Sequence, residues 1–367
     1  RFVARNLSYV DKIPDHHKLE GRARFMAPGH LRVGESIDVH AEKVIIACGS
    51  RPAISDVFQP VMARVLTSDS VFELEDLPRS VAVIGMGVIA LELGQALHRL
   101  GVDTTLYGRS GTLNALTHPD MQQQALDIFG NELDLYPSGQ VISTWETEEG
   151  AWIEYEQASG QRVTKVFDKV LVAAGRISNA DRLGIEHAGV SLTEAGRVVF
   201  DPQTMRCSDL PVFIAGDVTD DLPIWHEAFD EGRIAADNAL HYPATLPAVR
   251  RPPLMVLFTD PQIALIGQSY RQLQGRDIVI GELPFASPRH VVWNKVEGRI
   301  QVYLDARSGV ILGAELLGYR AEHLAHLLAL AITHGMTAEQ LLAMPVYHPS
   351  AEELLRDVLI DAQRKLV

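Results

Sequence analysis

The chain has 367 residues, of which 47% are hydrophobic and 22% are charged, and this composition is ordinary for a folded globular protein. Its formal net charge of −14 argues against nucleic acid or an anionic membrane as a partner, because both require a basic surface. No apolar run approaches the roughly 18 residues that a transmembrane helix needs, so no membrane span is expected.

Cysteine usage and length indicate the compartment and the number of domains. Cys48 and Cys207 are the two cysteines, and their separation excludes a disulfide framework and a cysteine-rich zinc cluster. This usage fits a reducing compartment, and since the sequence shows no secretory signal we expect a cytoplasmic protein. A chain of this length exceeds one compact core, so two or three domains are expected.

The N-terminal part of the chain combines short strands with turns. Strand-like pieces at 23–26 and 30–33 precede an apolar run at 43–47, which is typical of a buried parallel strand. That strand ends in a Cys-Gly-Ser-Arg-Pro turn at 48–52. A polar, irregular segment then leads to a short acidic helix expected at 73–76.

The strongest local pattern is a strand that runs directly into a glycine turn and a helix. The β-branched run at 80–84 predicts a buried strand, and the helical pattern behind the turn continues to Gly101. Gly85 permits the tight turn, Gly87 lets the backbone approach a pyrophosphate, and Ala90 allows the helix to pack closely on the strand. We interpret this as a dinucleotide-binding unit; a structural turn between strand and helix is the alternative.

The elements that follow continue an α/β pattern. They are a strand at 104–107, a helix near 121–129, strands at 152–156 and 163–167, and a buried strand at 169–174. This order predicts a doubly wound domain over about residues 75–190.

The composition of the chain changes from residue 254 onward. A strand at 211–215 ends in Gly216 and Asp217 and leads to a helix at about 224–240, after which prolines between 243 and 253 mark a boundary. The elements expected beyond it are strands at 300–305 and 309–317 and helices at 321–334 and 350–365. These predict an α+β domain.

The nucleotide specificity should be set at the end of the strand at 104–107. An acid about 20 residues past the first glycine would bond the ribose of NAD, whereas an arginine accommodates the 2′-phosphate of NADP. Gly108 occupies that position, Arg109 follows it, and the nearest acid, Asp103, lies at the wrong end of the strand. Gly108 would leave room and Arg109 could pair with the phosphate, so we predict NADP, with NAD as the alternative. The other interpretation is that Arg109 is an ordinary solvated loop residue.

Six motifs occur in a fixed order along the chain. They are Ala47-Cys48-Gly49-Ser50-Arg51-Pro52, Gly85-x-Gly87-x-x-Ala90-Leu91-Glu92, Ala173-Ala174-Gly175-Arg176-x-x-Asn179, Phe213-Ile214-Ala215-Gly216-Asp217, Thr259-Asp260-Pro261-Gln262-Ile263-Ala264 and Tyr347-His348-Pro349-Ser350-Ala351-Glu352-Glu353. In this order they resemble the flavin-dependent pyridine nucleotide–disulfide oxidoreductases, most of all the dihydrolipoamide dehydrogenases, over essentially the whole chain. The resemblance implies FAD, a nicotinamide nucleotide, a small dithiol or disulfide substrate and a homodimer.

The resemblance assigns five residues to the flavin. Gly49 would lie in a turn against FAD. Gly216 and Asp217 would form the second flavin motif, in which the aspartate accepts a hydrogen bond from the ribityl chain. Trp225 and His226 belong to a segment that passes near the isoalloxazine ring. Without the resemblance, Asp217 would be a surface turn acid and His226 a histidine packed on a helix.

The resemblance also assigns residues to the nicotinamide nucleotide. Glu92 matches a glutamate that reaches towards the nicotinamide, and Gly175 would line the nucleotide cleft. Cys48 stands where the family usually has threonine, and we expect it to be a small buried residue and not a redox thiol.

His348 and Glu353 bracket the start of the last helix. Ser350 is expected at the N-cap with Glu353 three residues further, as in a capping box, which would leave His348 an unrelated loop residue. The resemblance instead makes His348 the general base that takes a thiol proton and Glu353 the residue that fixes its tautomer. In the family this histidine serves the other subunit, which would make the C-terminal domain a dimer interface.

Two family features are not found in the sequence: the first FAD-binding glycine turn and the Cys-x4-Cys pair that relays electrons. We expect truncation, favoured by the start at Arg1, over a natural loss of the redox half; without that half the chain could not complete the cycle. The domains expected are a remnant of the FAD-binding domain at 1–74, an NAD(P)-binding domain at 75–190, a returning FAD-binding segment at 191–250 and a dimerisation domain at 251–367.

The sequence therefore predicts an α/β fold, with Rossmann-like FAD- and NAD(P)-binding domains and an α+β C-terminal dimerisation domain. The expected function is electron transfer between a nicotinamide nucleotide and a dithiol or disulfide, in the manner of dihydrolipoamide dehydrogenase. The alternatives are a non-disulfide NAD(P)H flavoenzyme such as a transhydrogenase or oxidase, an enzyme like glutathione or mercuric reductase, and a non-catalytic dimerising or nucleotide-binding fragment. No metal site is expected.

Overall fold

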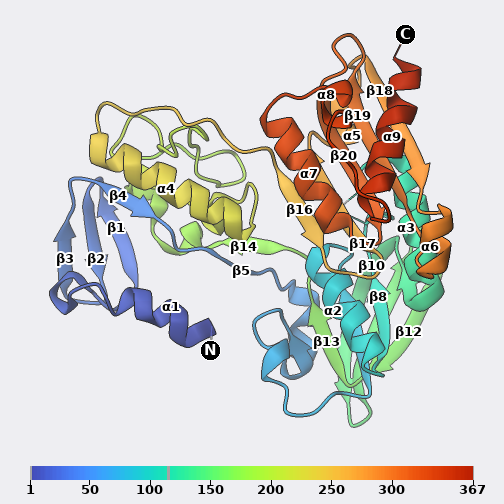
Figure 1. The fold of residues 1–367 in the computed structure, drawn as a ribbon. Helices are drawn as coiled ribbons and strands as arrows, with labels where there is room; N and C mark the ends of the chain where they lie inside the picture. The colour runs from blue at the N-terminus through green and yellow to red at the C-terminus, as the bar shows by residue number, and fades with distance from the viewer. Residues whose placement is uncertain (1, 114–115, 367) are drawn as a thin grey trace. The chain divides into compact units, whose positions relative to one another are not determined.

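The structure, a computed structural model, describes residues 2–113 and 116–366. The chain forms two compact units, each built from two stretches of sequence (Figure 1). The first unit contains the residues up to Arg51 together with Arg176–Arg250, and the second contains Pro52–Gly175 together with the residues from Arg251 onward. The two units are described separately below.

A five-stranded parallel sheet lies at the centre of the N-terminal part of the second unit. Its strands, in spatial order, are β6 (Val65–Leu66), β13 (Lys169–Val172), β7 (Ser80–Ile84), β8 (Asp103–Tyr107) and β9 (Asp134–Tyr136). The strand at Val65–Leu66 belongs to this sheet although it precedes residue 75. The expected strands at 80–84 and 104–107 are both present.

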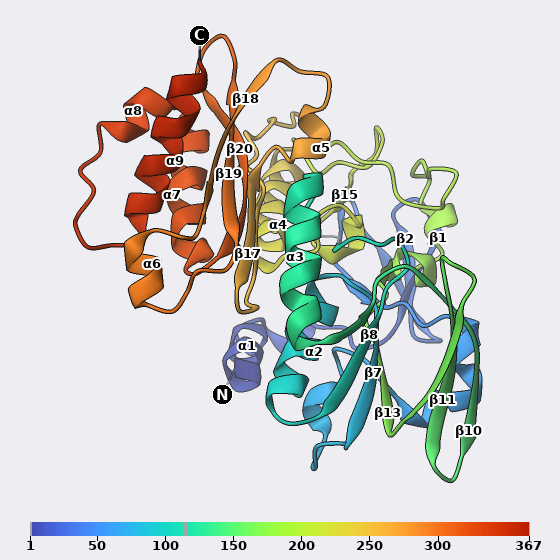
Figure 2. The ribbon, with the colours of Figure 1, turned by 90° about the vertical axis from the view of Figure 1, so that its right-hand side faces the viewer.

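The alternation of side chains along β7 gives this sheet two different buried faces. Val81 and Val83 share a core with α2 (Val88–Arg99) and α3 (Pro119–Glu132), which cover one face (Figure 2). Ala82 and Ile84 instead join a core with the antiparallel strands that cover the other face. Those strands are β10 (Gly139–Thr147), β11 (Gly150–Gln157) and β12 (Arg162–Phe167), together with the 3₁₀ segment η2 (Asp56–Arg64).

The C-terminal part of the second unit is an antiparallel sheet with helices. The strands, in spatial order, are β16 (Leu254–Leu257), β17 (Gln262–Gly267), β20 (Ile311–Gly318), β19 (Arg299–Asp305) and β18 (Ile278–Pro284). The helices are α5 (Tyr270–Leu273), α6 (Pro288–Val292), α7 (Ala321–Thr333), α8 (Ala338–Leu342) and α9 (Glu352–Lys365). Leucines of α7 and α9 pack on one face of this sheet.

The opposite side of this antiparallel sheet joins the core of the parallel sheet. Leu257, Ile263 and Leu317 are fully buried in the same cluster as Leu91 of α2 and Phe129 of α3. The parallel sheet and the C-terminal antiparallel sheet therefore share one hydrophobic core.

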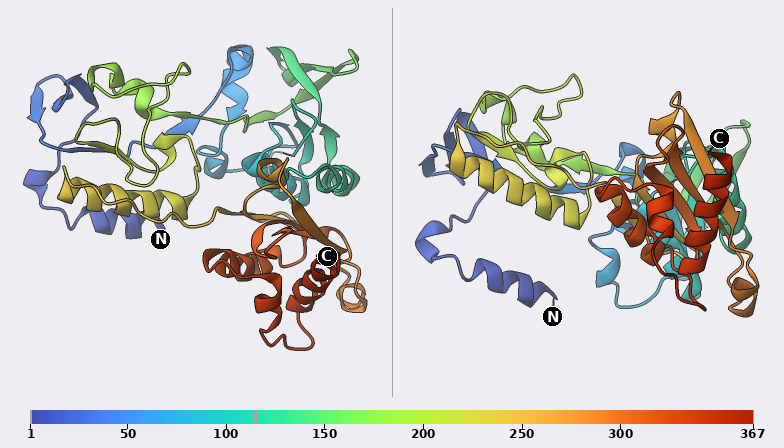
Figure 3. Two further views of the ribbon diagram at one scale, coloured as in Figure 1. Left: turned by 90° about the horizontal axis from the view of Figure 1, so that it is seen from above. Right: turned by 45° about the horizontal axis from the view of Figure 1, so that its top comes forward.

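The first unit contains the shorter strands. They are β1 (Ala23–Ala27), β2 (His30–Val33) and β3 (Ile37–His40) in one antiparallel sheet, β4 (Val44–Ile46) paired in parallel with β15 (Val212–Ile214), and β5 (Ser50–Pro52) beside β14 (Arg176–Ser178). The helix α4 (Trp225–His241) packs on β4 and β15 (Figure 3), and α1 (Phe2–Val10) begins the described chain.

The structure confirms the expected fold class, with a parallel-sheet α/β core and a separate antiparallel sheet, and corrects two local expectations. The acidic helix expected at 73–76 is a single 3₁₀ turn, η3 (Val71–Glu73), because Pro78 follows too closely for a longer helix. Cys48, expected to be buried, is exposed at the end of β4. Among the described residues, no helix is long and apolar enough to cross a membrane.

Candidate functional site

The glycine turn after β7 has the backbone geometry that dinucleotide binding needs. Gly85 has φ +130°, and a Cβ there would lie 2.3 Å from the carbonyl oxygen of Ala173, so only glycine fits. Gly87 is the N-cap of α2 and has open space where a side chain would be. The turn thus presents the free N–H groups of a helix N-terminus to an open position.

Two small residues let α2 lie close to the sheet. Ala90, one of the predicted residues, is fully buried. Gly94, which sequence reasoning missed, lies one turn further, and a Cβ there would be 3.2 Å from the Leu106 side chain of β8. The i, i+4 spacing of these two residues on one helix face was the signal that could have identified Gly94.

Gly175 lies at the end of β13, next to the glycine turn of β7. It has φ +128° with open space around it, and its carbonyl accepts the N–H of Ala53 at 3.0 Å. Since β7 and β13 are parallel neighbours, Gly85 and Gly175 occur at the same carboxyl edge of the sheet. This edge is where α/β sheets bind ligands.

The end of β8 differs in part from expectation. A Cβ on Gly108 would lie 2.5 Å from the carbonyl oxygen of Pro137 and 2.6 Å from Cγ of Met86, so protein atoms fill the space that was expected to receive a phosphate. Gly108 is therefore explained by loop packing. Arg109 is exposed, and no described residue pairs with its guanidinium. Of the two residues, Arg109 is the one available to a ligand.

Glu92 of α2 is engaged within the protein. Its Oε1 accepts the backbone N–H of Phe258 at 2.7 Å, and Phe258 itself is largely exposed. The carboxylate is thus held at a fixed place beside the loop between β16 and β17.

The flavin motifs of the first unit meet where β5 and β14 lie together. Ser50 donates a hydrogen bond from its hydroxyl to Asp217 at 3.1 Å, and Arg176 Nε donates to the Ser50 hydroxyl at 2.6 Å. Arg51 pairs with both oxygens of Asp181 at 2.8 and 2.6 Å and lowers the pKa of that carboxyl. Three motifs that are far apart in sequence therefore form one hydrogen-bonded group.

Gly216 is held by a buried carboxylate that sequence reasoning missed. Its N–H donates to Glu231 of α4 at 2.8 Å, and Arg250 donates to Glu231 at 3.1 Å and to Glu227 at 2.9 Å. Glu227 and Glu231 are 3% and 0% exposed, and burial raises the pKa of Glu231. Two acids four residues apart, on what becomes a buried helix face, were the available signal.

The residues expected near the isoalloxazine ring lie at the start of α4. Trp225 is 79% exposed and stacks on Phe229, with ring centroids 5.9 Å apart. His226 Nε2 lies 3.7 Å from Oε1 of Glu227. Gly49, after β4, has φ +68° and open space around it. Exposed aromatic rings, an open glycine turn and the anchored Gly216 turn are features that fit a flavin nucleotide.

His348 and Glu353 form a hydrogen-bonded pair before and within α9. His348 Nδ1 lies 2.9 Å from Glu353 Oε1, and the histidine side chain is 74% exposed whereas that of the glutamate is 13% exposed. Because Nδ1 faces the carboxylate, Nε2 is directed away from it. This geometry is that of a general base whose orientation is fixed by an acid.

The expected capping box is only half formed. The N–H of Ser350 donates to Glu353 Oε2 at 3.2 Å, but the helix begins at Glu352 with Ala351 as its N-cap, so Ser350 does not cap it. The half that is formed is the bond from the Ser350 N–H to Glu353, whose other oxygen contacts His348. One carboxylate thus serves both the helix start and the histidine.

Comparison with known proteins places the chain in a family. Residues 5–232 match the model of the pyridine nucleotide-disulphide oxidoreductases, and residues 254–358 match the dimerisation domain of the same family. The dihydrolipoyl dehydrogenase of Geobacillus stearothermophilus is 31% identical over 350 residues, which cover 92% of this chain and 72% of the relative. The mercuric reductase of Staphylococcus aureus is 32% identical over 345 residues, covering 92% of this chain and 62% of the relative.

A solved structure supports the same fold. The HOCl-induced flavoprotein disulfide reductase RclA from Escherichia coli superposes with a TM-score of 0.82 at 22% identity, covering 99% of this chain and 82% of that one. The family models and the relatives confirm the resemblance predicted from the ordered motifs. The chain belongs to the pyridine nucleotide-disulphide oxidoreductase family.

Proposed function

We propose that this protein passes electrons between a nicotinamide nucleotide and a small dithiol or disulfide, in the manner of a dihydrolipoyl dehydrogenase. The observation that carries the proposal is the pair formed by His348 and Glu353, with Nδ1 against the carboxylate and an exposed Nε2. A non-disulfide oxidase or transhydrogenase has no thiol proton to remove and needs no such base. The relative at 31% identity is named a dihydrolipoyl dehydrogenase, and the relative at 32% identity is named a mercuric reductase.

The proton chemistry follows from the orientation of the pair. A thiol that reaches His348 gives its proton to Nε2, so the S–H bond breaks, an N–H bond forms and the electron pair stays on sulfur as a thiolate. Glu353 stabilises the resulting imidazolium through Nδ1–H. The thiolate is the nucleophile of disulfide exchange, which is why the base is needed. In the reverse direction the imidazolium returns the proton to a leaving thiolate.

The cofactors would bind at the two sets of glycine turns. FAD would be held in the first unit by the turns at Gly49 and Gly216 with Asp217, and by the segment at Trp225 and His226. When bound, FAD supplies the hydride exchange with the nicotinamide. In the second unit, Gly85, Gly87, Ala90 and Gly175 would hold the nicotinamide nucleotide, with Glu92 near its nicotinamide end.

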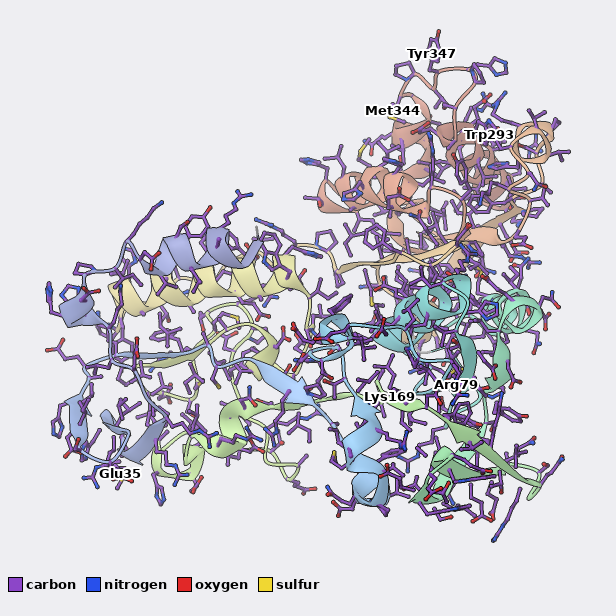
Figure 4. The ribbon with its side chains drawn as sticks, turned by 90° about the horizontal axis from the view of Figure 1, so that it is seen from below. Glu35, Arg79, Lys169, Trp293, Met344 and Tyr347 are labelled. Carbon is purple, nitrogen blue, oxygen red and sulfur yellow. The ribbon has the colours of Figure 1, made fainter. Side chains whose placement is uncertain are left out.

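We propose that the protein acts as a homodimer and that His348 serves the active site of the second copy. The chain matches the family's dimerisation domain at residues 254–358. Around the base, Val291, Val292 and Tyr347 are exposed apolar side chains, and Figure 4 shows Tyr347 projecting from the loop before α9. Exposed apolar side chains of this kind, within a matched dimerisation domain, support a surface that a second copy covers.

The direct test is an anaerobic assay with a panel of acceptors and donors. It uses the flavin-loaded protein together with the family's Cys-x4-Cys segment, because the chain without that pair is not expected to complete the cycle. We expect reduction of NADP⁺ by dihydrolipoamide, or oxidation of NADPH by a small disulfide, with rates that depend on the thiol reactant. Glutathione disulfide and mercuric ion are included as acceptors, because reduction of one of them would indicate an enzyme like glutathione reductase or mercuric reductase instead. Turnover only with oxygen, or only between two nucleotides, would exclude the dithiol function.

Nucleotide choice is tested at Arg109. NADPH should bind more tightly than NADH, and Arg109→Glu should reverse this preference by weakening NADPH binding about 10- to 100-fold, the value of a charge-assisted hydrogen bond to phosphate. Titration of both nucleotides by fluorescence gives the dissociation constants. Arg162→Glu, which makes the same change of charge at the exposed first residue of strand β12, is the matched control and should leave both dissociation constants unchanged. Equal affinity of the wild type for both nucleotides would refute the NADP assignment.

Flavin binding beside Gly49 can be measured with the neighbouring thiol. In the native flavin-free protein, iodoacetamide should label Cys48 and spare Cys207, since Cys207 is fully buried and burial raises the pKa of its thiol to about 12. Saturating FAD should slow the labelling of Cys48, as followed by intact-mass spectrometry. Unchanged labelling of Cys48 with FAD bound would place the flavin elsewhere. Denatured protein, in which both thiols react, is the control.

A further inference from the structure

Arg289 contacts both members of the catalytic pair. The side chain comes from α6 and is 19% exposed, with one guanidinium nitrogen paired to Glu353 Oε2 and the other, Nη2, 3.1 Å from Nδ1 of His348. The same Nδ1 lies 2.9 Å from Glu353 Oε1. One ring nitrogen of His348 therefore has two competing partners, a carboxylate that only accepts and a guanidinium that only donates.

The position of Arg289 is fixed by the packing of its own helix. The neighbouring His290 is 2% exposed and bonds the Ser287 hydroxyl through Nδ1 at 2.7 Å, with its ring between those of Phe285 and Trp293. The ring of Trp293, a residue labelled in Figure 4, also lies against that of Tyr319, with the ring centroids 5.6 Å apart. The phenyl ring of Phe285 packs directly on Gly318, where a side chain would not fit because its Cβ would lie 2.3 Å from the ring. Arg289 is thus held in place and is not a mobile surface arginine.

We propose, on the basis of the function proposed above, that Arg289 is a positioning residue that gives His348 two neutral tautomers. In one, Nδ1–H donates to Glu353 and Nε2 carries the lone pair that accepts a thiol proton. In the other, Nδ1 accepts from Arg289 and Nε2 carries the proton. The outward nitrogen can then present a lone pair that takes a proton from a thiol, or an N–H that donates a hydrogen bond to a thiolate. The proton itself is returned to a thiolate by the imidazolium, as described above.

Glu353 keeps its hydrogen bonds in both tautomers, so neither leaves a carboxylate unpaired. When Nδ1 turns to Arg289, Glu353 still pairs with the other guanidinium nitrogen and with the N–H of Ser350. Arg356 is the remaining charged neighbour of the pair, 4.0 Å from Glu353 and 2.8 Å from Asp357, and it makes no contact with His348 among those described. Arg289 and Arg356 both lie near the Glu353 carboxylate, but Arg289 is the one that contacts His348, so Arg356 serves as the control.

The tautomers can be read directly by ¹⁵N NMR of the full chain labelled at histidine, with His348→Gln identifying the signal. At a pH where His348 is neutral, the wild type should give Nδ1 and Nε2 shifts between the two limits, because both tautomers are populated. Arg289→Met should move Nδ1 to the protonated limit and Nε2 to the unprotonated one. Arg289→Lys, which keeps a donor, should restore intermediate shifts, and Arg356→Met should resemble the wild type.

Two results would overturn the proposal. One is a wild-type spectrum already at the limit seen in Arg289→Met, which would mean that Arg289 does not compete for Nδ1. The other is the same change in Arg356→Met, which would assign the effect to charge in general. The spectra are recorded without substrate, so a failure of the proposed function, seen as no turnover, is distinguished from a failure of this proposal. Thermal unfolding of each variant confirms that the fold is kept.

Discussion

Replacing Arg250 with methionine is expected to lower the free energy of unfolding by about 3–5 kcal/mol, the cost of leaving a buried charge without its partner. Arg250 is the shared partner of Glu227 and Glu231, at 2.9 and 3.1 Å, and both carboxylates are almost completely buried. Since Glu231 also holds the N–H of Gly216, flavin affinity should fall with stability. Hydrogen exchange of peptides from α4 measures the loss in this unit alone.

The controls separate charge from packing. Arg197→Met removes an exposed arginine of the same unit, whose partner Asp220 at 2.8 Å is partly exposed, and should cost less than about 1 kcal/mol. Adding Glu227→Gln and Glu231→Gln to Arg250→Met should recover part of the loss. An Arg250→Met protein as stable as the Arg197→Met control would show that the buried carboxylates do not need Arg250.

The same variant should have a characteristic pH dependence. Burial raises the pKa of Glu231 in the folded state above its unfolded value, and this shift grows when the compensating guanidinium is removed. The folded state then binds more protons than the unfolded state. The free energy of unfolding therefore falls as the pH rises above the unfolded-state pKa of this carboxyl and through its raised folded-state pKa. The difference in the free energy of unfolding between wild type and Arg250→Met should therefore become smaller as the pH is lowered from 7 towards 5.

Replacing His348 with glutamine should reduce the rate of dithiol oxidation about 10²- to 10⁴-fold, the usual contribution of a positioned general base. Nucleotide binding should be unchanged, because His348 belongs to the C-terminal sheet domain and not to the glycine turns. Stopped-flow reduction by dithiol, compared with equilibrium titration of NADPH, measures the two properties separately.

A histidine elsewhere in the same domain provides the control for this result. His326 of α7 bonds a backbone carbonyl of its own helix at 2.6 Å, and His326→Gln should leave dithiol oxidation within about two-fold of wild type. Glu353→Gln should give a smaller loss than His348→Gln, since the base remains but its orientation is less fixed. A rate in His348→Gln close to that of the His326 variant would remove His348 from the mechanism.

The parts of the molecule that the sequence predicted are those in which the chemistry is local. The strand, turn and helix around Gly85 lie within one short stretch, and the φ of +130° confirms why glycine stands there. His348 and Glu353 are five residues apart, and their hydrogen bond was anticipated from that spacing with the family resemblance. Gly108 shows the limit, because the atoms that fill its space come from Met86 and Pro137, which no local pattern brings to the end of β8.

Two of the residues that sequence reasoning missed, Arg250 and Arg289, act across long sequence separations. Arg250 reaches acids about 20 residues earlier, and Arg289 reaches a histidine 59 residues later. Each is an ordinary charged residue in its own segment, without a distinctive spacing. Their roles follow from tertiary packing: burial of one face of α4, and the aromatic anchoring of α6.

The hydrophobic core shared by the parallel and antiparallel sheets has a mechanical consequence. Leu257, Ile263 and Leu317 pack against α2 and α3, and buried Glu315 accepts the N–H groups of Thr117 and His118 at 2.9 and 3.1 Å. The glycine turn after β7 and the antiparallel sheet are thus expected to belong to one cooperative folding unit, because opening either of them breaks the same apolar contacts. Nucleotide binding should consequently protect the distant amides of β17 and β20 from hydrogen exchange as strongly as those of its own turn. The binding energy of the nucleotide would then also stabilise the sheet of the dimerisation domain.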